Sequence, residues 1–302
     1  MIYFKLVLTA FFWAAVFHLG KYAITYISPL SAAAWRFLLA TVFLLPYVLW
    51  QSRPDIAALR RNLWPLLAMG VIGVFGFNAA LFYGLRLTSP INGALIMAFN
   101  PATTALLAAM ITGEKISVRQ RTGFVISLVG VIVIISRGSL QHLLTLDVST
   151  GDLLIFLANL CWATYTVIPR RFINGLPSMT ITIATIAIGA AILTVTAQSV
   201  SGDMLMVHTW KLAASLIAIA LFGAALAYIW WNQGILQIGS GRVSIFINLV
   251  PMFTVLIGVV LGQMPSAAQW LGALLVICGV IVTVYNRDAM RAGSNAVARD
   301  GR

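Results

Sequence analysis

The chain is poor in charged residues, and poorest in acids. Only 9% of its 302 residues are charged, with seven Asp or Glu against 19 Lys or Arg, while hydrophobic residues make up 61%. The mean hydropathy is +0.98. Soluble globular domains carry about 25% charged residues. The composition therefore excludes that class and indicates a membrane protein with many spans.

The few acids avoid the apolar segments. They lie in loops, in the tail or at the ends of apolar runs: Asp55, Glu114, Asp147, Asp152, Asp203, Asp288 and Asp300. Embedded carboxylates are the usual sign of proton or cation coupling and of sites for organic cations. Their absence argues against a multidrug mechanism built on a buried glutamate.

Motifs for several other chemistries are missing too. No glycine-rich loop ends in Lys-Ser or Lys-Thr, so direct use of ATP is not expected. The two cysteines, Cys161 and Cys278, lie far apart within apolar runs and suggest packing, so neither a metal site nor a cofactor is expected. An intramembrane enzyme is the rival class. Against it, His142 and His208 fall in loops, and no histidine follows Ser240 in the later helices to activate it.

Apolar runs long enough to cross about 30 Å of hydrocarbon are abundant. We find ten of them, at residues 3–21, 30–50, 64–85, 92–112, 120–137, 151–169, 178–198, 211–232, 243–262 and 268–286. They predict an all-α integral membrane protein with ten transmembrane helices. The first run lacks a small-residue cleavage site and is expected to remain as a helix.

Basic residues gather on one side of the predicted spans. With the N-terminus inside, the cytoplasmic segments hold fourteen Lys or Arg, and the outer segments hold four, namely Lys21, Arg86, Arg137 and Lys211. The positive-inside rule therefore places both termini in the cytoplasm. The net charge of +12 then reflects loop orientation, and no nucleic-acid partner is expected. Arg36 alone falls within a span.

The chain matches itself at an offset of 148 to 150 residues. The matched residues are Trp13-Ala14 with Trp162-Ala163, Lys21 with Arg170, Pro29 with Pro177, Gly84 with Gly234, Pro101 with Pro251, Gly123 with Gly272, and Gly130 with Gly279. Each half holds five spans, and an odd number makes the second half enter from the opposite side, giving two inverted five-helix repeats. We assign the repeats to 1–137 and 151–286, a periplasmic connecting loop to 138–150 and a disordered cytoplasmic tail to 287–302.

Five local patterns carry a family resemblance. They are FFWAAVFHLGK at 11–21, SPLSAAAWRF at 28–37, YGLRLTSPINGALIMAFNP at 83–101, TGEKIS at 112–117 and GFVISLVGVIVI at 123–134. With the ten-span layout, they resemble the EamA-type members of the drug/metabolite transporter superfamily. The resemblance implies a basket whose central cavity is lined by spans 1, 3, 4, 6, 8 and 9. One departure is Gln263-Met264 where the first half has Gly113-Glu114, which puts a paired role for that carboxylate in doubt.

Neutral polar and aromatic side chains in those six spans are the candidates for substrate binding. They are Trp13, Asn78, Phe82, Phe99, Asn100, Trp162, Tyr165, Tyr228, Asn232, Ser244 and Asn248. An indole can stack on an aromatic or apolar ligand and offer one donor, whereas each amide has the alternative role of an interhelical hydrogen bond. Spans 2, 5, 7 and 10 are more uniformly apolar, and we expect them to face lipid or partner helices.

Two prolines mark expected hinges. Pro101 and Pro251 occupy equivalent places in spans 4 and 9, and each should kink its helix and free the carbonyl of Met97 or Ile247. Three further residues are candidates for a gate or for energy coupling, the alternatives being a structural histidine and two span ends: His18, Lys21 and Arg170.

These features together predict a secondary transporter that exports small metabolites, chiefly aromatic or other apolar amino acids, by alternating access across the inner membrane of a bacterium. A wide apolar cavity with aromatic walls and no fixed counter-charge suits bulky, net-neutral zwitterions. The alternatives are a proton-coupled exporter of other metabolites or drugs, an intramembrane enzyme, and a passive channel, which usually shows rings of like charge. The expected partners are the small substrate and the lipid bilayer, with no obligate protein partner.

Overall fold

The computed structural model describes residues 1–51, 56–112, 118–136, 138–139 and 149–284. Within these residues all regular secondary structure is helical. The first half contains α1 (Ile2–Ala23), α2 (Pro29–Gln51), α3 (Ile56–Arg61), α4 (Leu63–Ala68), the π-helix η1 (Met69–Gly76), α5 (Phe77–Leu87), α6 (Pro90–Met97), α7 (Asn100–Thr112) and α8 (Val118–Ile135). The second contains α10 (Thr150–Phe172), α11 (Ser178–Val200), α12 (Trp210–Ala218), the π-helix η2 (Ile219–Leu226), α13 (Ala227–Ile238), α14 (Ser240–Ser244), the 3-10 helix η3 (Ile245–Asn248), α15 (Leu249–Val260) and α16 (Ala267–Val284).

The helical segments follow the ten predicted spans. Eight are long and apolar enough to cross a membrane, and two shorter apolar helices, Arg121–Ile134 and Ala267–Gly279, stand at spans 5 and 10. The predicted all-α membrane fold is therefore confirmed. Glu114, most of the expected connecting loop (140–148) and the expected tail (287–302) lie outside the described residues.

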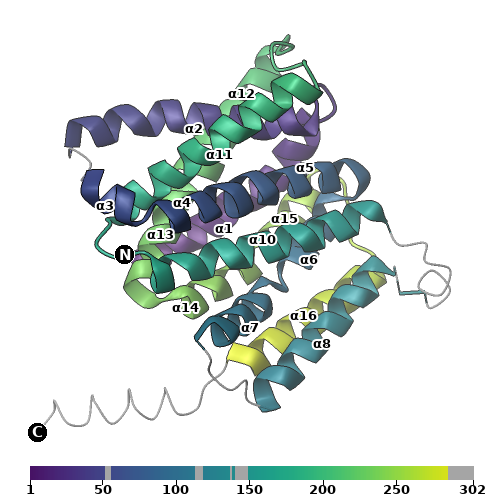
Figure 1. Ribbon diagram of the computed structural model, residues 1–302. Coiled ribbons are helices and arrows are strands. Elements are labelled where there is room, and N and C mark those ends of the chain that lie inside the picture. Colours follow the sequence, from purple (N-terminus) through teal and green to yellow (C-terminus); the bar gives the residue numbers. More distant parts are fainter. Residues whose placement is uncertain (52–55, 113–117, 137, 140–148, 285–302) are drawn as a thin grey trace, which may run out of the picture.

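The first helix of each half packs into the other half. Helix α1 lies against η2, α13 and α15, and α10 lies in the matching way against η1, α5 and α7. Figure 1 shows α1 and α10 running through the middle of the bundle, with the α2/α11 pair on one side and the α8/α16 pair on the opposite side. This exchange brings residues from the two halves together at the centre of the molecule.

The matched glycines bring α8 and α16 into close contact. A Cβ on Gly130 would lie 2.7 Å from the carbonyl oxygen of Gly272, and a Cβ on Gly279 would lie 2.3 Å from the Oγ of Ser127. The Ser127 hydroxyl in turn donates to the carbonyl of Val276 at 3.1 Å. Small residues allow helices to approach closely in a bilayer, where no hydrophobic drive holds them together.

A π-helix interrupts the third span of each half, which the sequence did not reveal. Gly73 in η1 and Gly223 in η2 stand at equivalent places, 150 residues apart. A Cβ on Gly73 would meet the side chain of Tyr165 at 2.4 Å, and one on Gly223 would meet that of Val16 at 2.3 Å. Such wide turns are frequent at functional sites because they alter the backbone hydrogen-bonding pattern.

The fourth span of each half is interrupted just before its proline. Helix α6 ends at Met97 and α7 begins at Asn100, so Pro101 is the second residue of α7. In the other half, η3 precedes α15, of which Pro251 is the third residue. The carbonyl of Met97, which proline was predicted to free, accepts a hydrogen bond from Asn159 Nδ2 at 3.3 Å. Motion at these breaks remains a prediction.

Candidate functional site: a central aromatic cavity

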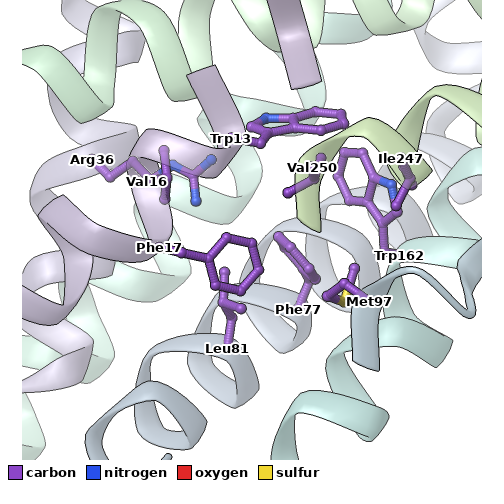
Figure 2. A pocket seen from close by; sticks show the side chains of 10 residues that line it. All are labelled: Trp13, Val16, Phe17, Arg36, Phe77, Leu81, Met97, Trp162, Ile247 and Val250. Atoms are coloured by element: carbon purple, nitrogen blue, oxygen red, sulfur yellow. The ribbon is translucent and has the colours of Figure 1, made fainter. Parts of the chain in front are cut away.

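A mainly apolar cavity lies where the two halves meet. Its outline covers about 400 Å³, which includes space open to solvent. Seven helices of both halves contribute to its wall, which consists of Trp13, Val16, Phe17, Arg36, Phe77, Leu81, Met97, Trp162, Ile247 and Val250. Figure 2 shows these side chains converging from several helices, with Trp13 and Trp162 near one another. The exchange of α1 and α10 between the halves places both indoles here.

The indoles belong to a larger cluster of aromatic rings. Trp162 lies parallel to Tyr165, with centroids 5.0 Å apart and planes at 10°, and meets Tyr228 edge to face at 5.2 Å. The ring of Trp13 lies 4.9 Å from that of Trp231. Of the predicted binding residues, Trp13 and Trp162 line the cavity. Tyr165 and Tyr228 are fully buried behind them and hold Trp162 in place.

Arg36 brings a positive charge to the cavity wall. Its side chain is 1% exposed and lies within α2. Nη1 donates to Asn78 Oδ1 at 2.9 Å, and Nη2 donates to the carbonyl of Gly223 at 2.6 Å. The same carbonyl accepts from Trp13 Nε1 at 3.1 Å. The expectations that span 2 takes no part in the cavity and that the cavity holds no fixed charge are therefore wrong. The signal was present, because an ionisable residue inside a span indicates a functional site by default.

The predicted amides mostly join helices. Asn100 Nδ2 donates to the Asn159 carbonyl at 3.0 Å, and Asn232 Nδ2 donates to Tyr165 Oη and Thr182 Oγ1, both at 2.8 Å. Asn78 accepts from Arg36 as described above. This is the alternative role that the sequence left open for each amide. None of the three is among the residues of the cavity wall.

The other predicted binding residues lie away from the wall as well. Phe82 packs beside Gly20, and Phe99 lies against the rings of Phe124 at 5.1 Å and Phe156 at 5.9 Å. Two more residues stand in the broken ninth span. Ser244 donates to the Gly241 carbonyl, whereas Asn248 Oδ1 is buried and accepts no hydrogen bond within the described residues.

The gate candidates lie near the end of α1. His18 Nε2 forms a hydrogen bond with the carbonyl of Thr254 at 2.9 Å, which requires a proton on that nitrogen. Lys21 Nζ donates to the carbonyls of Leu85 at 2.5 Å and Thr88 at 2.9 Å. A lysine at the last carbonyls of a helix caps its negative end. The third candidate, Arg170, belongs to α10, and its side chain lies outside the described part of the structure.

Polar contacts tie the two halves together at both ends of the bundle. Near the N-terminus of α2, Asp203 accepts hydrogen bonds from Ser28 and Ser31. Partial burial raises the pKa of Asp203, but the hydrogen bonds from Ser31 and Ser28 outweigh burial and bring the pKa below its usual value. In a second contact, Asn62 Nδ2 donates to the Asn174 carbonyl, and the Asn174 N–H donates to Asn62 Oδ1, both at 3.0 Å. Neither contact was predicted, because both join loops.

Comparison with known proteins agrees with this architecture. A model described as the EamA-like transporter family matches residues 1–136 and 149–285. The chain is 40% identical over 284 residues to the uncharacterized transporter YyaM of Bacillus subtilis, covering 93% of this chain and 92% of that protein. It is 24% identical over 226 residues to the aromatic amino acid exporter YddG of Ancylobacter novellus, covering 74% and 75%.

Two further matches are more distant. A probable amino-acid metabolite efflux pump of Escherichia coli is 24% identical over 298 residues, covering 93% of this chain and 95% of the pump. A solved crystal structure has the same fold, with a TM-score of 0.66 and 20% identity over 92% of this chain and 95% of the other. The family match, present in both halves, shows that this multi-pass membrane protein belongs to the EamA-like transporter family.

Proposed function

We propose that the protein is a secondary carrier that exports aromatic and other apolar amino acids across a bacterial inner membrane. The observation that carries the proposal is the pair of indoles, Trp13 and Trp162, which line one cavity between the halves. The names of two relatives, an aromatic amino acid exporter and a probable amino-acid metabolite efflux pump, support this substrate class.

The cavity suits a ring-bearing ligand of modest size. Its wall is lined mainly by apolar and aromatic side chains, as is usual for small-molecule sites. Phe77 and Trp162, with centroids 5.0 Å apart, offer ring faces and edges beside Phe17 and Leu81. Each aromatic contact contributes about 0.5–1.5 kcal/mol beyond simple burial. A substrate with an aromatic side chain therefore gains most from this wall.

Alternating access requires the contacts between the halves to open one end at a time. Two contacts between the halves are formed together: Asp203 with Ser28, just before α2, and Asn62 with Asn174, just before α4. With cytoplasmic termini, as basic residues in the loops favour, Ser28 faces outward and Asn62 faces inward. Export then alternates the breaking of these two contacts.

Counterflow in proteoliposomes tests the proposal. Vesicles loaded with unlabelled tryptophan should transiently concentrate external labelled tryptophan and phenylalanine, and should do so weakly or not at all for glutamate and lysine. A carrier gives this overshoot because one substrate returns the binding site for the next, whereas a channel gives only equilibration. Equilibration without overshoot would indicate a channel. Chemical conversion of the labelled amino acid would instead support the alternative of an intramembrane enzyme. Counterflow of none of the amino acids would overturn the proposal.

A further inference from the structure

No described carboxylate contacts the buried charge of Arg36. The structure describes two acids, Asp152 and Asp203, and each accepts hydrogen bonds at the end of a span, from Thr88 and from Ser28 respectively. The Arg36 side chain is 1% exposed, donates to the two neutral oxygens described above and lies over the ring of Phe37, 5.1 Å from its centroid. A cation at membrane depth without a counter-ion is costly, and such residues mark sites for substrates or ions.

The Arg36 guanidinium has N–H groups that donate to no described protein acceptor and could donate to a ligand. Of its five N–H groups, one on Nη1 is directed to Asn78 and one on Nη2 to Gly223. The Nε atom is buried and donates to no acceptor within the described residues. Figure 2 shows the guanidinium at one side of the cavity and the ring of Trp162 at the other. A ligand with an acidic group toward Arg36 and a ring against Trp162 matches this order.

We propose that Arg36 binds the carboxylate of the transported substrate and that this group, not the ammonium, is what the cavity requires. This inference rests on the proposed function and names the substrate's essential group. A guanidinium pairs with a carboxylate through charge-assisted hydrogen bonds, often two in parallel. The ammonium of an amino acid, in contrast, meets no acid in the wall. Aromatic acids without an amino group should therefore bind, and aromatic amines should be rejected.

Arg36 also links α2 to α5 and η2, so a structural role must be distinguished from a binding role. If Arg36 only held these helices together, its loss would weaken the binding of all ligands alike. A contact with the carboxylate instead affects only those ligands that carry one. The ratio of affinities between ligands with the same ring separates the two roles.

The test measures equilibrium binding of three indole ligands to the purified full-length protein: tryptophan, indole-3-propionate and tryptamine. The wild type should bind the two carboxylates at least about tenfold more tightly than tryptamine, as expected for hydrogen bonds to a charged group. Arg36→Gln should weaken both carboxylates by about tenfold to a hundredfold and leave tryptamine unchanged or tighter. Arg60→Gln removes an exposed cation from α3 and is the matched control, which should keep the wild-type ratio.

A second variant keeps the test decisive if Arg36→Gln does not fold. Asn78→Asp nearly preserves the side-chain shape and puts a carboxylate at the 2.9 Å contact with Nη1. This internal carboxylate neutralises Arg36 and competes with the carboxylate of the ligand. The preference for indole-3-propionate over tryptamine should fall by about tenfold or more. Elution as a single peak in size-exclusion chromatography verifies that each variant is folded.

The outcomes separate this inference from the proposed function. Equal binding of tryptophan and tryptamine by the wild type, or an unchanged ratio in the folded variants, overturns the role of Arg36 and leaves amino acid export standing. Binding of indole-3-propionate without tryptophan supports Arg36 and overturns amino acid export. Binding of none of the three ligands overturns both.

Discussion

The rings of Trp13 and Trp162 meet edge to face, with centroids 5.1 Å apart and planes at 84°. They occupy equivalent positions in the two halves, 149 residues apart in the chain. Because α1 and α10 each pack into the opposite half, this contact lies where the halves meet. Any movement of one half against the other therefore rearranges the two rings, and the cavity changes shape with them.

Shortening the Trp162 ring should weaken transport without unfolding the protein. Complete removal in Trp162→Ala would leave a hole costing about 3–5 kcal/mol, since the side chain is buried. Trp162→Phe keeps a ring but loses part of the stack on Tyr165. We expect counterflow of tryptophan to fall about twofold to tenfold, equivalent to one aromatic contact.

The control for this substitution is Trp64→Phe, because Trp64 is 81% exposed on α4 at the surface of the helix bundle. Rates are compared at equal amounts of reconstituted protein. If Trp162→Phe showed the same counterflow rate as the wild type, Trp162 would not belong to the binding site.

Close packing of α8 on α16 predicts a large effect from a single methyl group. In Gly130→Ala the new Cβ would lie 2.7 Å from both the Gly272 oxygen and the Val276 nitrogen, which are backbone atoms. The helices must separate, and overpacking of this kind costs about 1–3 kcal/mol. We expect a lower thermal midpoint in detergent. Gly241→Ala is the control, since nothing lies within 4 Å of its added Cβ. Equal midpoints for the two variants would contradict the described packing.

The contact at Asp203 should make stability depend on pH. Its pKa is lower in the folded protein than in the unfolded chain, so the folded state favours the carboxylate. The stabilisation is complete above the unfolded value of about 3.9 and is lost as the pH falls through the folded value. Wild-type thermal midpoints measured from pH 7 downward should therefore decline more steeply at acidic pH than those of Asp203→Asn. Parallel curves would show that this contact contributes no pH dependence.

Features that depend on composition and repeats were predictable, whereas orientation within an apolar helix was not. Apolar runs identified the spans, and matched residues identified the glycines of α8 and α16 and the indoles of the cavity. Phe99 was predicted to bind substrate but does not line the cavity. A helix that is apolar on all sides gives no sign of which face meets the cavity. The ring of Phe99 lies against Phe124 and Phe156 instead.

Neither Arg36 nor the π-helices were predicted to belong to the site. Arg36 was evident as a cation within span 2, but the otherwise apolar character of that span led us to expect that it faces lipid or partner helices. The π-helices contain Gly73 and Gly223, at which an added Cβ would overlap a neighbouring side chain. These glycines are 150 residues apart, so they were a usable signal of a feature shared by the two halves.

Coupling of transport to a proton gradient requires a group in the cavity that titrates near physiological pH. The cavity wall contains no group that titrates between pH 5 and 8, and His18 is the side chain within the described spans whose ordinary pKa falls in that range. His18 instead bonds to the Thr254 carbonyl and is not part of the wall. We therefore expect facilitated transport, with direction set by the tryptophan gradient. In proteoliposomes with the membrane potential clamped, a pH gradient of either sign should leave the final internal-to-external tryptophan ratio at one. Uphill accumulation would show proton coupling, and its loss in His18→Ala would identify His18 as the coupling residue.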